Sequence, residues 1–248
     1  MDIKNCDQLI DQILKPINVD YPCGSWSRYT KEFMALRQAR EEDDPNLPMG
    51  DWERPLIKAD WNKISDKCID FLQNNSKDLL VAVWLCDALI RTHQINGLRV
   101  GMTILEKLIS KYWETIWPVI EEDDIEGRIS PFIWLNTALV TRLNQSIVLL
   151  KPAVGRTKSL YLMDWEKAFR NNLNNGSTRD TIRDSTNHGD IDWLLEVQDN
   201  SNKSLIIIDE ISKKLDQFLK SESPSINCLK KTIGSISSFS ESSIKKIK

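Results

Sequence analysis

Apolar residues recur three and four positions apart along most of this chain, which is the spacing of one face of an α-helix. The spacing predicts a short first helix over residues 9–17, which Pro16 ends or kinks. A second helix is predicted over 28–42 and a third over 61–73, with Asp60 as the N-cap of the third. In each of these helices the apolar residues share one face and the charged residues lie on the other.

The stretch 79–86 is the most apolar part of the sequence, because it contains no polar residue. A helix of a soluble protein that is apolar on every side is surrounded by other elements, so this one is predicted to be central. Ser76 is the predicted N-cap of this helix, and Asn96 that of the next. Within that next helix, Gly101 would let another helix approach closely. A further helix is expected over 131–150.

A second region with weaker patterning follows residue 150. Residues 151–189 are interpreted as a connecting segment, whose 171–189 part is rich in Asn, Ser, Thr, Asp and Gly and is predicted to be a flexible linker. Residues 190–248 are predicted to form a second helical region, with a tail that frays from Ser235. Because the chain has only nine Gly and nine Pro in 248 residues, the expected fold class is all-α. A compact helical domain over 1–150 would be followed by the smaller helical region.

Composition narrows the class of protein. The net charge of −3 does not provide the basic surface that a nucleic-acid-binding protein needs. The first residues lack the basic and then apolar order of a secretory signal, and the 79–86 run is far shorter than the roughly 20 residues that span a bilayer. The five cysteines are odd in number and have no CxxC spacing, which favours a reduced compartment, the cytoplasm.

Residues suited to catalysis or metal binding do not form a recognisable set. The two histidines, His93 and His188, match no metal-ligand spacing. The acidic runs 41–44 and 121–124 are typical of solvated loops, with a contact surface for a basic partner as the alternative. The sequence has no phosphate-binding glycine motif and no nucleophile elbow. We therefore expect no enzymatic activity, no catalytic residues, no metal site and no cofactor.

Nine tryptophans are many for a chain of this length. Tryptophan is enriched at binding hot spots, but packing beneath a loop is the alternative for each of them and is favoured by roughly two to one. Two segments combine tryptophan with charge, as hot spots do. The candidate partner-binding residues are Trp52, Glu53 and Arg54 in the loop 43–58, and Trp113 and Trp117 in the segment 113–124.

A series of short motifs over about residues 20–150 resembles the ImpA N-terminal domain of TssA-type proteins. Each motif is weak alone, and their order and spacing make the resemblance specific. In order they are Pro22-Cys23-Gly24, Phe33 with Leu36 and Ala39-Arg40, Gly50 with Trp52-Glu53-Arg54, Ala59-Asp60-Trp61, Ser76-Lys77-Asp78-Leu79, Val83-Trp84-Leu85 with Ala88-Leu89, Gly97-Leu98 with Gly101, Tyr112-Trp113, Trp117-Pro118, and Arg128 with Trp134-Leu135.

The resemblance implies an all-α structural component of the bacterial type VI secretion machine, located in the cytoplasm. Its N-terminal part would contact baseplate proteins and the tail sheath and tube, with membrane-complex proteins as further candidates. Neither nucleic acid nor direct membrane insertion is implied. Family resemblance places ring formation in a C-terminal domain that this sequence is expected to lack, so we expect a monomer or small homo-oligomer. The alternative function is a generic cytoplasmic helical adaptor with unrelated protein partners, which explains the helices and tryptophans equally well.

Overall fold

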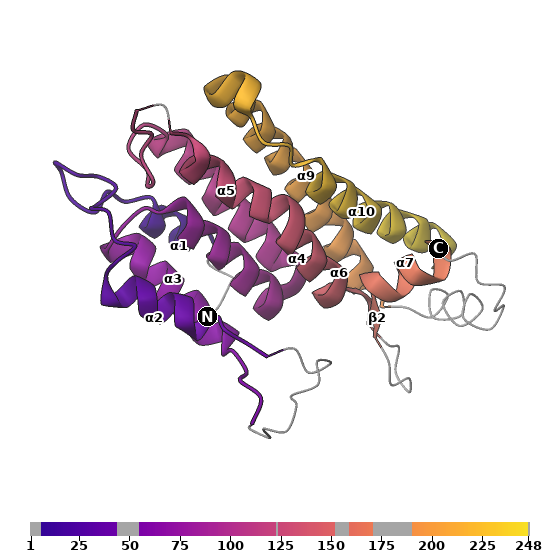
Figure 1. Cartoon of the computed structure of the whole chain (residues 1–248). Helices are drawn as coiled ribbons and strands as arrows, with labels where there is room; N and C mark the ends of the chain where they lie inside the picture. Colours follow the sequence, from indigo (N-terminus) through magenta and orange to yellow (C-terminus); the bar gives the residue numbers. More distant parts are fainter. Residues whose placement is uncertain (1–5, 44–54, 123, 152–158, 171–189, 248) are drawn as a thin grey trace.

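The computed structural model of the chain describes residues 6–43, 55–122, 124–151, 159–170 and 190–247. These residues form helices almost throughout, together with one small sheet (Figure 1). The elements are, in order, α1 (Cys6–Ile13), α2 (Lys31–Ala39), α3 (Trp61–Asn74), α4 (Leu79–Tyr112), α5 (Glu126–Trp134), a π-helical turn (Leu135–Leu139), α6 (Val140–Ser146), β1 (Val148–Leu150), β2 (Leu160–Tyr161), α7 (Leu162–Arg170), α9 (Ile191–Leu219), a 3₁₀ turn (Lys220–Glu222) and α10 (Asn227–Ile247).

Helix α4 lies at the centre of the arrangement. It packs against α3 on one side, with α2 outside α3, and against α9 on the other side, with α10 outside α9 (Figure 1). Side chains from all of these helices join one continuous hydrophobic core. The first residues of α4 are almost all buried: Leu79, Val83 and Leu85 have no exposed surface, and Leu80 is partly buried. The prediction of a central apolar helix at this point of the sequence is therefore confirmed.

The two halves of α4 fold back on each other. The chain reverses at Gln94, whose φ of 57° and ψ of −138° are not helical. A Cβ atom placed on Gly97 would lie 1.9 Å from the carbonyl oxygen of Leu89, and one placed on Gly101 would lie 2.9 Å from the Cα atom of Cys86. These contacts pair later residues of one half with earlier residues of the other, so the halves are antiparallel. The close approach expected at Gly101 is confirmed.

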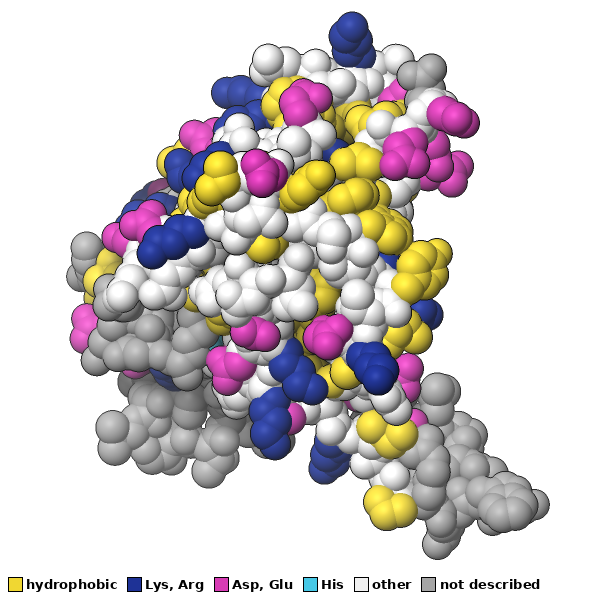
Figure 2. Space-filling view, turned by 90° about the vertical axis from the view of Figure 1, so that its left-hand side faces the viewer, with side chains coloured by type: hydrophobic (Ala, Val, Ile, Leu, Met, Phe, Trp, Pro, Cys, Tyr) yellow, Lys and Arg dark blue, Asp and Glu magenta, His cyan; other side chains and the backbone are white. Residues whose placement is uncertain are grey.

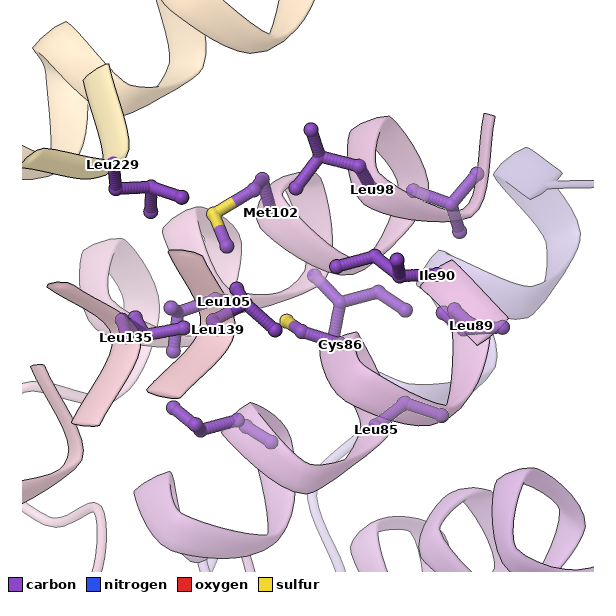
Figure 3. Close-up of a cluster of buried hydrophobic side chains, with 14 of the residues drawn as sticks. Leu85, Cys86, Leu89, Ile90, Leu98, Met102, Leu105, Leu135, Leu139 and Leu229 are labelled. Atoms are coloured by element: carbon purple, nitrogen blue, oxygen red, sulfur yellow. The ribbon is translucent and has the colours of Figure 1, made fainter. Parts of the chain in front are cut away.

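The hydrophobic cluster around this hairpin draws side chains from distant parts of the chain (Figure 3). Its members are buried, and they come from both halves of α4, from the π-helical turn and from α10. Those labelled in Figure 3 are Leu85, Cys86, Leu89, Ile90, Leu98, Met102, Leu105, Leu135, Leu139 and Leu229. Dense packing of this kind leaves little tolerance for added volume.

The ends of the helices partly match the sequence prediction. Asp60 caps α3 as expected, since its Oδ1 accepts a hydrogen bond from the backbone N–H of Lys63. The cap of α4 is Asp78 rather than Ser76, because the Asp78 carboxylate accepts from the N–H of Leu80. The expected cap at Asn96 is also wrong: the break falls at Gln94, whose Oε1 accepts from the N–H of Val148.

The segment 131–150 is less regular than predicted. The single expected helix is replaced by the end of α5, the π-helical turn and α6, and the chain then becomes extended in β1. Strand β1 pairs with β2 in an antiparallel two-stranded sheet, with Val148 opposite Tyr161. The all-α class is confirmed for the rest of the described chain.

The C-terminal helix continues where the sequence predicted fraying. Helix α10 extends to Ile247, and Ile236, Phe239 and Ile244 are buried. The serines between them are small enough to let α9 approach, and the hydroxyl of Ser240 donates to the carbonyl of Ile236. A serine-rich helix can therefore be buried without leaving its hydroxyls unpaired. The predicted linker over 171–189 lies outside the described residues.

We predict that Gly97→Ala lowers the free energy of unfolding by about 1–3 kcal/mol, because the new methyl group has no room beside the Leu89 carbonyl. The matched control is Gly234→Ala in α10, where no atom lies within 4 Å of the added Cβ. That change should raise the free energy of unfolding by up to about 1 kcal/mol, because Ala favours a helix more than Gly does. Urea unfolding followed by circular dichroism measures both. Equal effects of the two changes would contradict the close approach.

Candidate functional site

Three short extended stretches meet at the end of α4 where the hairpin begins and finishes. The N–H of Lys77 donates to the carbonyl of Cys23, and the N–H of Trp117 donates to the carbonyl of Lys77, each at 2.9 Å. Isolated bridges pair Gly24 with Ser76 and Asp78 with Trp117. Gly24 has a φ of 69°, and a Cβ there would lie 2.3 Å from the Asn75 carbonyl oxygen. Only glycine fits this position.

An open groove of about 480 Å³ lies beside these stretches. This volume is within the range of small binding sites. Figure 2 looks onto the end of the molecule that carries the 16–30 segment and shows hydrophobic side chains at the surface among charged ones. The residues that line the groove are Ile17, Asn18, Tyr21, Gly24, Ser25, Trp26, Asn74, Asn75 and Trp117.

Aromatic side chains dominate the exposed part of the groove. Tyr21 is 69% exposed and Trp26 is 38% exposed, which is high for side chains of this size. The rings of Trp26 and Trp117 are 5.4 Å apart at an angle of 56°, and Tyr29 also meets Trp26 edge-on. The groove therefore offers a cluster of aromatic surface to a partner.

The two indole N–H groups of the groove are used differently. The Nε1 of Trp117 donates to the carbonyl of Gly24 at 3.1 Å, which fixes its ring against the groove floor. The Nε1 of Trp26 makes no hydrogen bond to any described residue, and the Arg28 guanidinium lies 5.0 Å from its ring centre. Arg28 is itself held by the Asp78 carboxylate at 2.9 Å. The ring of Trp26 is thus in contact with Arg28, and its indole N–H is available to a partner.

Two buried cations fix the backbone around the groove. The ammonium of Lys77 donates to the carbonyls of Ile13 and Leu72, both at 2.6 Å. Arg128 donates to three carbonyls of the segment that contains Trp117, those of residues 113, 116 and 118. Burial lowers the pKa of Lys77 to about 8 and that of Arg128 to about 10. Lys77 thus ties α1 to the start of α4, and Arg128 ties the start of α5 to the segment that precedes it.

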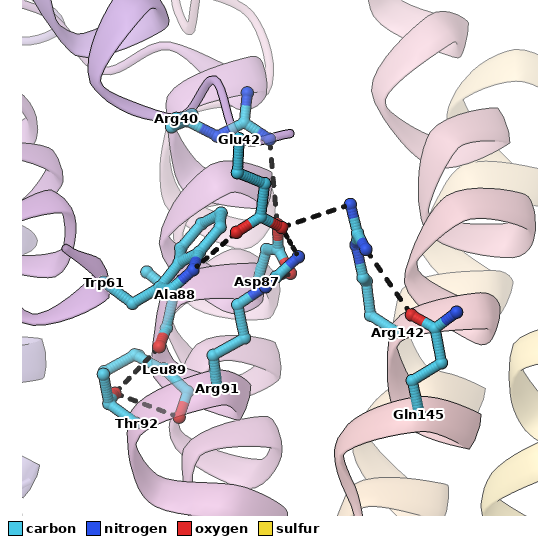
Figure 4. Close-up of polar contacts among 10 residues, drawn as sticks. All are labelled: Arg40, Glu42, Trp61, Asp87, Ala88, Leu89, Arg91, Thr92, Arg142 and Gln145. Atoms are coloured by element: carbon cyan, nitrogen blue, oxygen red, sulfur yellow. Dashed lines mark hydrogen bonds and ion pairs between the residues drawn. The ribbon is translucent and has the colours of Figure 1, made fainter. Parts of the chain in front are cut away.

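A second polar cluster links α2, α4 and α6 (Figure 4). Arg91 contacts Asp87 at 3.1 Å and Glu42 at 2.9 Å, and Arg142 reaches towards Glu42 from α6. Arg40 pairs with Asp87 and lies over the Trp84 ring, and burial lowers its pKa. Because its charges mainly satisfy one another, this cluster is best explained as packing.

The predicted site residues fall into three groups. Trp52, Glu53 and Arg54 lie outside the described residues. Trp113, which the sequence suggested as an exposed contact, is only 7% exposed and stacks on Phe218 of α9 at 4.6 Å. Its exposure was therefore predicted wrongly, because the second helical region covers it. Trp117 lies in the groove.

Trp26 and Tyr21 are the groove residues that the sequence interpretation did not select. The signal that could have found them is the turn at Tyr21-Pro22-Cys23-Gly24, followed closely by an unpatterned tryptophan.

In the described part of the chain, no three residues of the His, Cys, Asp and Glu types gather closely enough to hold a metal ion. Among the same described residues, no helix has both the length and the hydrophobicity to cross a membrane.

Comparison with known proteins gives three matches. Residues 14–137 match the family described as ImpA, N-terminal, type VI secretion system. The type VI secretion system component TssA1 of Pseudomonas aeruginosa is 28% identical over 112 residues, which are 45% of this chain and 32% of that protein. The matched part therefore spans about a third of the relative's length.

The third match is a solved structure and concerns the fold. It is the N-terminal domain, including the conserved ImpA_N region, of the TssA component of the type VI secretion system from Burkholderia cenocepacia. The TM-score is 0.80, with 96% of this chain and 94% of that chain covered at 23% identity. The arrangement of helices is thus shared along almost the whole chain.

We predict that the difference in free energy of unfolding between the unaltered protein and Lys77→Met increases in favour of the unaltered protein as the pH rises from about 8 to about 10. Because the folded pKa is lowered, the unfolded chain binds more protons in this range, and stability increases with pH by up to about 1 kcal/mol per unit. Below this range the cost of burying the charge is constant. Urea unfolding of both proteins across the range measures the difference, in which groups common to both cancel. A flat difference would mean that the two carbonyls keep the proton on Lys77.

Proposed function

Because this chain belongs to the ImpA N-terminal family of the type VI secretion system, we propose that it is a structural assembly component of the bacterial secretion machine. It would act in the cytoplasm as the docking part of a TssA-type protein and contact baseplate and contractile tail components. Membrane-complex proteins are further candidate partners. The role is one of binding and not of catalysis.

The observation that carries this proposal is the aromatic groove. All of its lining residues fall between positions 17 and 117, inside the region 14–137 that matches the family. The groove is held by backbone hydrogen bonds and by the buried ammonium of Lys77, so its shape is present before a partner arrives. Exposed tryptophan and tyrosine beside a preformed hollow are the usual anchors of protein recognition.

We expect the double change Tyr21→Ala and Trp26→Ala to weaken binding to baseplate or tail sheath proteins by roughly tenfold or more, because both side chains lose their contact area. The proteins would be purified from the bacterium that supplies this chain and measured by biolayer interferometry. The matched control is Ile206→Ala, which removes a hydrophobic side chain that is 61% exposed on α9. The melting temperature should change little in both variants. Full binding by the double variant would refute docking through the groove.

The loop 43–58 supplies an independent test. Replacement of Trp52 and Arg54 by Ala should weaken binding to the same proteins and leave the melting temperature nearly unchanged, if these residues form a contact as their composition suggests. Differential scanning fluorimetry beside the binding assay separates the outcomes. Unfolding of this variant would assign the two side chains to packing, and unchanged binding would leave the groove as the docking site.

A further inference from the structure

The groove beside Trp26 and Trp117 is uncharged. Its lining consists of aromatic, amide, hydroxyl and apolar side chains. Arg28 and Asp78, which lie beside Trp26 and Trp117, form an ion pair with each other, and Asp78 also caps α4. A charged group of a partner would lose its water here without meeting an opposite charge, which is costly. The lining therefore favours an uncharged occupant.

Three polar groups in the groove are open, and one of them, the indole N–H of Trp26, can act only as a hydrogen-bond donor. Neither the indole N–H of Trp26 nor the hydroxyl of Tyr21 bonds to another residue in the described part of the chain, and the same is true of the Asn75 side-chain amide. An indole N–H can only donate, whereas a hydroxyl and an amide can donate or accept. An occupant that satisfies Trp26 must bring an acceptor there, such as a carbonyl oxygen that is not already bonded.

This requirement separates the common forms of a docked peptide. An α-helix has already bonded most of its carbonyls internally, so it cannot satisfy these donors. An added β-strand pairs through the backbone of its host, whereas the open groups named above belong to side chains. A polyproline II segment has no internal hydrogen bonds, and each proline keeps its carbonyl while lacking an N–H.

The ring geometry agrees with such a segment. The N–H of Trp117 is bonded to Gly24, so this ring presents carbon to the groove, and the Trp26 ring meets it at 56°. Flat aromatic faces with an indole N–H at their edge form the type of surface on which proline rings and polyproline carbonyls dock.

We propose that the groove binds an extended, uncharged, proline-containing segment of a partner protein in the polyproline II conformation. This inference rests on the proposed function for the partner, and it specifies the chemistry that the groove recognises. Trp26 donates its N–H to a carbonyl of the segment, Trp117 and Tyr21 pack on its rings, and the Asn75 amide bonds its backbone.

The test is a titration of the ¹⁵N-labelled full chain with a capped peptide built from repeated Pro-Pro-Leu units, followed by NMR. The Trp26 indole resonance, identified by its loss in Trp26→Phe, should shift with saturation. Two matched peptides carry Ala in place of each Pro, or Glu in place of each Leu. Both should bind roughly tenfold more weakly or worse. Trp26→Phe and Asn75→Ala should each reduce affinity several-fold, whereas Ile206→Ala should leave it unchanged.

The inference fails if the indole resonance does not move up to the solubility limit of the peptide. It also fails if the alanine peptide binds equally well. Tighter binding of the glutamate peptide would overturn it too and would indicate an acidic segment. These results are independent of the machine proteins. If the groove variants lose baseplate or sheath binding while the proline peptide does not bind, the proposed function stands and this inference fails. If the peptide binds but the machine proteins bind the groove variants normally, docking of those proteins through the groove fails, and the preference of the groove for a proline segment stands.

Discussion

The close approach of the two halves of α4 is the constraint on which the rest of the structure depends. Gly97 against the Leu89 carbonyl and Gly101 against Cys86 set the distance between the halves, and no larger residue fits without displacement of backbone. Because the halves are antiparallel, the start of α4 at Asp78 and the stretch that follows its end, which contains Trp117, lie side by side. The groove lies at this end of the α4 hairpin, and α3 and α9 cover the two sides of the hairpin. A packing contact deep in the core thus decides where a surface site can form.

Buried cations extend this constraint to the loops. Burying an ammonium or guanidinium without an anionic partner costs several kcal/mol, and hydrogen bonds to backbone carbonyls offset part of this. Lys77 donates to two such carbonyls and Arg128 to three. The pKa of each is still lowered, because these hydrogen bonds offset only part of the cost of burying the charge. In exchange, loops that lack regular structure are held in one conformation. A groove made of loops can then bind without first becoming ordered, which improves affinity.

Local features of the fold were predictable from sequence, whereas of the groove the sequence selected only Trp117. The Asp60 cap, the central 79–86 helix and the close approach at Gly101 follow from neighbouring residues alone. The groove joins positions near 21, 75 and 117, which no spacing rule connects. Trp113 and Trp117 are four residues apart, yet one is covered by Phe218 of α9 and the other lines the groove. Their difference depends on the placement of a helix that begins at Ile191. The burial of α10 was missed because composition does not show that serine hydroxyls can bond within their own helix.

Charge and aromatic surface have separate tasks in this molecule. Several ion pairs are formed by largely buried carboxylates or connect distant segments: Arg91 with Asp87 and Glu42, Lys214 with Glu106, and Arg28 with Asp78. These groups are already matched, so they offer little to a partner. The groove has aromatic faces and open polar groups in place of charge, so the proposed recognition through it would depend on burial and hydrogen-bond geometry. Binding through it should then be weakly sensitive to salt and should lower the heat capacity, as expected for apolar surface removed from water. Selectivity at such a surface comes from the shape and the acceptors of the bound segment, since a mismatched polar group would remain unpaired.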